Sequence, residues 1–231
     1  RVRARALPSH TPAGRSAQQA AMFTRTLMTQ SLGMRRGIRA AALNKRVAAL
    51  STRRVAAASG MRRSVVLASL PAALPEVTFK VRVRDESIGG DNPFKWTDVT
   101  AKDLMGGKRV VLFSLPGAFT PTCSTFQLPG FEDNYEEFKK LGIDEVYCLS
   151  VNDSFVMNKW AQSQDLKHVK VIPDGSAKFT DLMGMNVQKD NHGFGQRSWR
   201  YAVVANDMKV EQTFVEPGKC ENGSTDDDPY G

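Results

Sequence analysis

Few cysteines and few histidines limit the chemistry that this sequence can support. Its 231 residues include three cysteines and three histidines, and no CxxC pair is present. An odd, small number of cysteines argues against a secreted disulfide framework. The histidines, His10, His168 and His192, show no metal-ligand spacing with one another or with the cysteines, so we expect no bound metal. No apolar run reaches the length of a membrane span, and we expect no membrane partner.

Acidic residues are missing from the first third of the chain. Residues 1–75 contain 13 Arg and one Lys but no Asp or Glu, a net charge of +14. The remainder therefore holds 32 − 14 = 18 basic and 24 acidic residues, a net charge of −6. A nucleic-acid-binding domain would carry its basic residues in a folded patch, so we expect no nucleic-acid partner for the body of the protein.

The basic segment is rich in Ala, Arg and Ser and includes the stretch AALNKRVAALSTRRVAAASG, which has the pattern of a basic amphipathic helix. This composition is typical of an organelle transit peptide. A cationic segment is drawn across a membrane by an inside-negative potential, at about 2.3 kcal/mol per charge per 100 mV. We expect a mitochondrial destination, with the plastid as the alternative, and Met22 as a candidate start. A disordered basic tail that contacts RNA or anionic lipid is the competing interpretation.

Beyond Pro71 and Pro75, strand and helix patterns alternate. Period-two alternation or continuous apolar runs predict strands at 77–83, 110–115, 144–151 and 169–172, and a final hairpin of 198–205 and 208–215 through Asn206-Asp207. Apolar residues at helical spacing predict helices at 123–141, with a kink near 129, and at 154–164 and 176–183. Residues 85–100 and 186–195 are expected to be loops. The order β-α-β-α-β-α-β-β predicts an α/β fold of thioredoxin topology, a central mixed sheet with helices on both faces.

The stretch PGAFTPTC places a lone cysteine, Cys123, where the strand at 110–115 passes into the helix at 123–141. Free backbone N–H groups and the helix dipole at such a point favour an anion, so we expect a thiolate. Thiolates attack weak bonds, chiefly the O–O bond of peroxides and the S–S bond of disulfides. Thr120 stands where a thioredoxin carries its partner cysteine, and its hydroxyl cannot form a disulfide. The competing interpretation of Cys123 is a small buried apolar residue.

PGAFTPTC also matches the PxxxTxxC signature of the peroxiredoxins. Three blocks, VLFSLPGAFTPTCSTFQLPGF, CLSVNDSFVMNKW and RSWRYAVV, together resemble the type II atypical, peroxiredoxin-5-like branch over residues 75–220. The resemblance implies a thiol peroxidase that reduces hydrogen peroxide and organic hydroperoxides through a cysteine sulfenic acid. It divides the chain into a transit peptide at 1–72 and a thioredoxin-like peroxiredoxin (redoxin) domain at 73–231. Members usually continue into a further helix, so the C-terminus is either truncated or lacks it.

The resemblance implies a role for each residue of the site. Cys123 would be the peroxidatic cysteine, and Thr120 would orient the peroxide through its hydroxyl. Pro116 would shield the sulfur from water, and Arg200 would stabilise the negative charge that grows on the departing oxygen.

Two further residues, Phe119 and Thr122, would line the substrate pocket. Arg197 lies three residues before Arg200 and would face the other side of a regular strand, so we leave it out of the catalytic set.

The thiol that resolves the sulfenic acid is open between three candidates: Cys148, Cys220 and an external thiol. The resemblance implies glutathione, glutaredoxin or thioredoxin as the reductant, a homodimer, and no organic cofactor. Two other functions compete with the peroxidase. One is a thiol–disulfide oxidoreductase of thioredoxin or glutaredoxin type, and the other is a redox-regulated binding module without catalysis.

Overall fold

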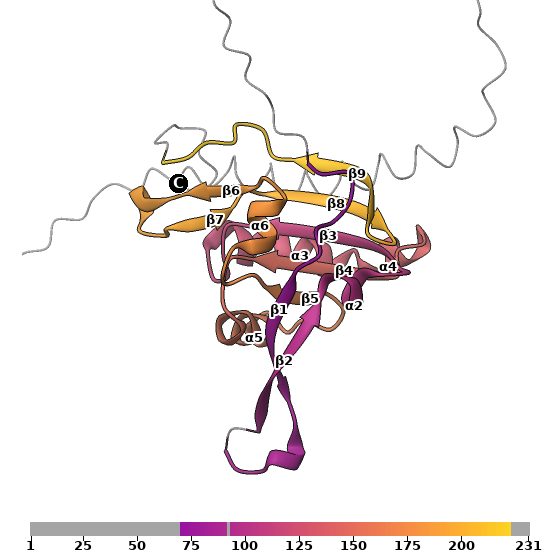
Figure 1. Ribbon diagram of the computed structural model, residues 1–231, viewed down its shortest axis with the longest axis vertical. Coiled ribbons are helices and arrows are strands. Elements are labelled where there is room, and N and C mark those ends of the chain that lie inside the picture. Colours follow the sequence, from indigo (N-terminus) through magenta and orange to yellow (C-terminus); the bar gives the residue numbers. More distant parts are fainter. Residues whose placement is uncertain (1–69, 92, 223–231) are drawn as a thin grey trace, which may run out of the picture.

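A five-stranded mixed sheet organises the chain in the computed structural model, which describes residues 70–91 and 93–222 (Figure 1). The strands run in the order β5-β4-β3-β8-β9. Their bounds are Arg109–Leu115 for β3, Glu145–Ser150 for β4, Lys170–Pro173 for β5, Tyr201–Asn206 for β8 and Lys209–Val215 for β9. β3, β4 and β5 are parallel, whereas β8 is antiparallel to β3 and to β9. This confirms the predicted thioredoxin-like sheet.

Two apolar cores lie on opposite faces of this sheet, because successive residues of a strand point to opposite sides. The first core contains Val110 and Leu112 of β3 and is covered by α2 (Ala101–Met105) and α6 (Lys178–Leu182). The second core contains Val111 and Phe113 and is covered by α3 (Leu128–Asp133), α4 (Tyr135–Lys140) and α5 (Ser154–Ser163). Cys123 belongs to the second core. Its neighbours are therefore fixed by that face of the sheet.

The helix predicted at 123–141 is present but irregular. Its first turns form a π-helix, η3 (Cys123–Gln127), in which the N–H of Leu128 donates to the carbonyl of Cys123. Regular α3 follows, and α4 begins after a break at Asn134. Pro129 has no N–H to donate, so the regular hydrogen-bond ladder cannot continue through this position. The irregularity therefore begins at the cysteine itself, earlier than the predicted kink.

The prediction of a loop over 85–100 is wrong in its second half. β2 (Phe94–Thr100) pairs antiparallel with β1 (Thr78–Arg84) along its whole length, and η2 (Glu86–Ile88) lies in the connection. The predicted strand at 77–83 is present as β1, which pairs with β2 alone and forms a ribbon separate from the central sheet. The far end of this ribbon extends away from the rest of the molecule (Figure 1).

The stretch before Arg200 also differs from the prediction. The loop expected at 186–195 contains β6 (Asn186–Gln188), which pairs with β7 (Gln196–Ser198), and η4 (Asp190–His192) lies between them. Trp199 and Arg200 then lie outside any strand. The β8–β9 hairpin turns at Asp207 and Met208, both with positive φ (47° and 67°), one residue later than predicted. That geometry fits the right-handed twist of the paired strands.

The transit-peptide prediction falls almost wholly on residues 1–69, outside the described residues. Within the described part, no helix combines the length and apolar character needed to cross a membrane. The described chain joins the sheet soon after its start, since the N–H of Val210 in β9 donates to the carbonyl of Ala72.

Candidate active site

Cys123 lies in the first turns of a helix, just beyond the end of the central strand β3. The N–H of Ser124 donates to the carbonyl of Thr120 (3.0 Å), so the helical turn that contains Cys123 begins at Thr120. The Cys123 residue is 1 % exposed and packs in the second core. Its side chain is thus both near a helix start and shielded from bulk water.

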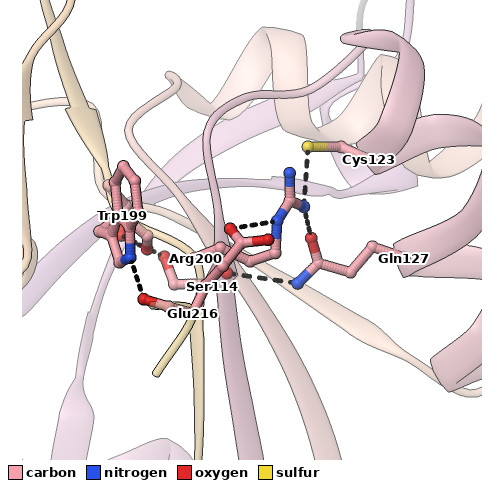
Figure 2. A network of polar contacts seen from close by, with 7 residues as sticks. Ser114, Cys123, Gln127, Trp199, Arg200 and Glu216 are labelled. Atoms are coloured by element: carbon pink, nitrogen blue, oxygen red, sulfur yellow. Dashed lines mark hydrogen bonds and ion pairs between the residues drawn. The ribbon is translucent and has the colours of Figure 1, made fainter. Parts of the chain in front are cut away.

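Arg200 points its guanidinium at this sulfur from the end of β7, as Figure 2 shows. Its Nη1 lies 3.6 Å from the Sγ of Cys123, and the same nitrogen donates to Oε1 of Gln127. Its Nε donates to Oε2 of Glu216 at 3.0 Å. Arg200 is 1 % exposed, so a cation is held beside the sulfur in a site that excludes bulk water.

The partners of Arg200 are themselves held in place (Figure 2). Nε2 of Gln127 donates to the carbonyl of Ser114 in β3 (3.4 Å). The indole Nε1 of Trp199 donates to the carbonyl of Glu216 (2.7 Å), and the N–H of Glu216 donates to the carbonyl of Arg200 (3.1 Å). The guanidinium is therefore fixed by groups from the helix and from the end of β9, and needs little reorganisation when charge develops nearby.

The loop between β3 and the helix is shaped by short internal contacts. The hydroxyl of Thr120 donates to the carbonyl of Gly117 (2.8 Å), which leaves its oxygen lone pairs available as acceptors. Oδ1 of Asn152, after β4, accepts from the N–H of Ala118 (2.9 Å) and from the hydroxyl of Ser150 (2.8 Å). The loop is thereby tied to the adjacent parallel strand.

The remaining predicted residues take different positions in this loop. Pro116 is buried, Thr122 is half-buried, and Phe119 is 54 % exposed with a positive φ of 64°. Phe119 thus projects outward from the loop, and Pro116 lies inside the protein.

Arg197 contacts the same loop, contrary to our expectation that it faces away. A Cβ placed on Gly117 would lie 3.1 Å from Nη1 of Arg197, so the guanidinium rests against this glycine. The same side chain donates to the carbonyls of Phe194 (3.1 Å) and Val151 (3.4 Å). The expectation failed because it assumed a regular strand through Arg200, whereas β7 ends at Ser198.

The other two cysteines do not lie beside Arg200 as Cys123 does. Cys148 is buried in the middle of β4, paired with β3 and β5 on either side. Burial, and secondly the charge of Cys123, raise the pKa of the Cys148 thiol well above its ordinary value. Cys220 is half-buried against the first core, on the opposite face of the sheet from Cys123. The structure therefore places Cys220 away from the site and holds Cys148 within the sheet, in the same core as Cys123.

Three residues of this arrangement were not predicted: Gln127, Glu216 and Asn152. Gln127 lies four residues after Cys123, one helical turn, and that spacing could have indicated it. Glu216 is brought to Arg200 by the register of the β8–β9 hairpin, and Asn152 by the parallel pairing of β3 and β4. Neither has a local signal in the sequence. Among the residues that the structure describes, no group of His, Cys, Asp and Glu could hold a metal ion.

A thioredoxin-like sheet with a thiol at a helix start and a fixed guanidinium beside it defines the class of thiol-based redox enzymes. The Redoxin family matches residues 93–228 of the chain. The chain belongs to this family and, within it, to the peroxiredoxins, which are thiol-dependent peroxidases.

Three relatives illustrate the comparison. A peroxiredoxin of Rhizobium etli is 65% identical over 158 residues, which cover 68% of this chain and 87% of the relative. The hybrid peroxiredoxin hyPrx5 of Haemophilus influenzae is 45% identical over 63% of this chain and 57% of its own length. The crystal structure of the Plasmodium falciparum antioxidant protein (1-Cys peroxiredoxin) aligns with a TM-score of 0.61 at 37% identity, covering 68% of this chain and 92% of that one.

Proposed function

We propose that this peroxidase reduces hydrogen peroxide and organic hydroperoxides at Cys123, and that an external thiol recycles the enzyme. The thiolate attacks one peroxide oxygen, the O–O bond breaks, and the second oxygen leaves as water or an alcohol after it takes up a proton. Cys123 is left as a sulfenic acid. The contact between Nη1 of Arg200 and the Sγ of Cys123 is the observation that carries the proposal.

Arg200 is suited to both stages of this step. Before reaction, its positive charge lies 3.6 Å from the sulfur that attacks the peroxide. As the O–O bond breaks, negative charge moves to the departing oxygen, and a guanidinium already fixed by Glu216 and Gln127 can stabilise it without reorganising. The Thr120 hydroxyl, which donates to Gly117, can accept a hydrogen bond from the O–H of the peroxide and so orient it.

Burial of Cys123 favours a peroxide over a protein disulfide as the oxidising substrate. With the residue 1 % exposed, a disulfide on a protein surface cannot align with the sulfur without a large local opening, whereas a small hydroperoxide needs a much smaller one. A thioredoxin-type enzyme also needs a second cysteine near the first, and here that position is Thr120. These two features argue against the thiol–disulfide oxidoreductase.

An external reductant fits the positions of the other cysteines. Cys148 is fixed in the centre of the sheet, where burial raises the pKa of its thiol, and Cys220 lies on the opposite face. The π-helical turn at Cys123–Gln127 is the segment that would open to admit glutathione, glutaredoxin or thioredoxin, since π-turns frequently mark functional sites. The 1-Cys relative from Plasmodium falciparum is consistent with a cycle that uses one cysteine.

Three finer assignments belong to the proposal as well. The sequence blocks around Cys123 and the likeness to hyPrx5 support a place in the type II, peroxiredoxin-5-like branch. Exposed Phe119 and Phe126 supply apolar surface that a homodimer would bury. The acid-free basic segment at 1–75 supports import into the mitochondrion, or into the plastid as the alternative.

Stopped-flow mixing with hydrogen peroxide tests the central claim. The protein should lose one thiol rapidly, Cys123→Ser should lose the fast phase, and Cys148→Ser should retain it. Fast thiol loss that survives in Cys123→Ser would contradict the proposal. Turnover assays with glutathione plus glutaredoxin and with thioredoxin would then identify the reductant, and an insulin-reduction assay should show no activity.

A further inference from the structure

A second cysteine and a buried lysine lie together on the opposite face of the sheet from Cys123. Lys189 follows β6, is 0 % exposed, and its Nζ lies 3.5 Å from the Sγ of Cys220. The same nitrogen donates to the carbonyl of Glu221 (3.0 Å) and lies 5.7 Å from the centre of the Trp199 ring. Cys220 is not in a disulfide and is half-buried.

The segment that carries Cys220 is held against β6 and the turn after it by several contacts. Oε2 of Glu221 accepts from the N–H of Gln188 (2.5 Å), and Oδ1 of Asn222 accepts from the N–H of Asp190 (2.7 Å). On the other side, Nζ of Lys219 donates to the carbonyl of Gly184 (2.6 Å). The segment that carries the thiol is thus held by contacts on both sides of Cys220, close to the amine of Lys189. Such fixed proximity raises the rate of reaction between two groups.

We propose that Lys189 and Cys220 form a second redox-active pair, in which a hydroperoxide oxidises Cys220 and the Lys189 amine then closes a Nζ–Sγ sulfenamide bond. In the first step the sulfur attacks a peroxide oxygen, the O–O bond breaks, and a sulfenic acid and an alcohol or water result. In the second step the deprotonated amine attacks the sulfur, the S–O bond breaks, and the hydroxyl leaves with an amine proton as water. One thiol, one amine and one hydroperoxide therefore give one N–S bond, one alcohol and one water.

The positive charge of Lys189 assists the first step. Nζ of Lys189 lies 3.5 Å from the Sγ that attacks the peroxide, and a positive charge there stabilises the negative charge that develops on the departing oxygen. After oxidation, the amine is the nucleophile already in contact with the sulfur, whereas Cys123 lies across the sheet. Sulfenic acids condense with nearby nitrogen as well as with thiols, and the product is reopened by thiols. The bond would therefore protect Cys220 from irreversible oxidation.

The position of the pair suggests a consequence for the active site. The bond would fix the segment after Glu216 relative to the neighbourhood of Trp199, and the indole of Trp199 already donates to the carbonyl of Glu216. Glu216 holds Arg200 in turn. Closure should thus leave the support of Arg200 in place under oxidising conditions.

Peptide mass mapping of the full chain after treatment with excess hydrogen peroxide tests the pair. We expect a cross-linked peptide that joins residues 189 and 220 and is two hydrogens lighter than the sum of its parts. The cross-link should disappear on treatment with dithiothreitol, and Cys220 should then be alkylated. Running the map also on Cys123→Ser separates this claim from the peroxidase mechanism, because that variant lacks the peroxidatic thiol but keeps the pair.

Two variants complete the design. In Lys189→Arg the cross-link should be lost and Cys220 should appear as sulfinic acid. The control Lys178→Arg, at an exposed lysine of α6, should still form the cross-link. Cys220→Ser should lack the cross-link and serves if Lys189→Arg fails to fold. In the wild-type chain and in Cys123→Ser, sulfinic acid at Cys220 without a cross-link, or Cys220 still reduced, would overturn the inference. A disulfide between Cys123 and Cys220 in the wild-type chain would overturn it as well.

Discussion

Replacing Arg200 by lysine separates the charge of this side chain from its geometry. The guanidinium contacts Glu216 through Nε while Nη1 contacts Cys123 and Gln127. A lysine has one nitrogen and can satisfy only one side of this arrangement. Because Glu216 is a buried carboxylate, 8 % exposed in its side chain, we expect the lysine to pair with it and to withdraw from the sulfur.

The size of the effect follows from the separation. Two unit charges at 3.6 Å attract by about 4.6 kcal/mol at an effective dielectric constant of about 20. Part of this attraction survives in the variant, since its charge stays nearby. Removing one preorganised donor from a charge-stabilising site typically costs a factor of about 10²–10³ in rate. We therefore expect the rate constant of Arg200→Lys with hydrogen peroxide to fall by about 10²–10³-fold.

Stopped-flow measurement of peroxide-dependent thiol loss gives this rate constant directly. Arg109→Lys is the matched control, because Nε of Arg109 also donates to a carboxylate, that of Glu211 at 2.9 Å, but in a pair about a third exposed. The control should keep the wild-type rate and lose less than about 1 kcal/mol of stability. An Arg200→Lys rate within about fivefold of wild type, a change of about 1 kcal/mol, would refute the assigned role of the guanidinium geometry.

Three further predictions follow from buried groups outside the reacting atoms. Asn152→Ala leaves the N–H of Ala118 without its acceptor, and urea unfolding should show a stability lower by about 1–3 kcal/mol. The variant should also react more slowly with peroxide, because the loop is held less tightly. An unchanged rate would contradict the role of this contact. Burial raises the pKa of Tyr147 to about 12 from 10.0, so this hydroxyl ionises at lower pH in the unfolded chain than in the folded protein. The free energy of unfolding should therefore fall as pH rises from 10 towards 12. Urea titrations of Tyr147→Phe should show a smaller fall in the free energy of unfolding over this pH range. Burial also raises the pKa of Cys148, and iodoacetamide at pH 9 should label Cys220 in the native protein but label Cys148 only after unfolding.

The sequence predicted those strands that are buried on both faces of the sheet, or that alternate between buried and exposed residues. The run Val110–Leu115 is apolar throughout and became the central strand β3, with helices on both faces. The helix predicted at 154–164 is present as α5, and the carboxylate of Asp153 caps its start by accepting from the N–H groups of Phe155 and Val156. The strand β2 was missed because turn residues at Gly89-Gly90 masked the alternation that begins at Phe94.

Glu216 shows why the surroundings of Arg200 could not be predicted in the same way. The β8–β9 hairpin pairs Tyr201 with Val215, which brings Glu216 opposite Arg200. That register depends on the exact turn position and on an irregularity between Val204 and Ala205. The predicted turn lies one residue earlier and has no irregularity, and it would place Thr213 opposite Arg200 instead. An error of one residue in the predicted turn changes every residue pair of the hairpin. The buried ion pair of Arg200 and Glu216 could therefore not be predicted.

Local sequence by itself was enough to identify the family and to predict Cys123 as the nucleophile. A cysteine after PGAFTPT at the junction of an apolar strand and a helix needs no distant residue to be recognised, because the turn, the helix start and the thiol are contiguous in the chain. The tertiary structure alone decided which groups surround that thiol. Arg200 contacts Cys123 from 77 residues along the chain, and Glu216 in turn contacts Arg200. Such contacts depend on register and packing across the whole sheet, and these are set by the sum of many weak interactions rather than by any one motif.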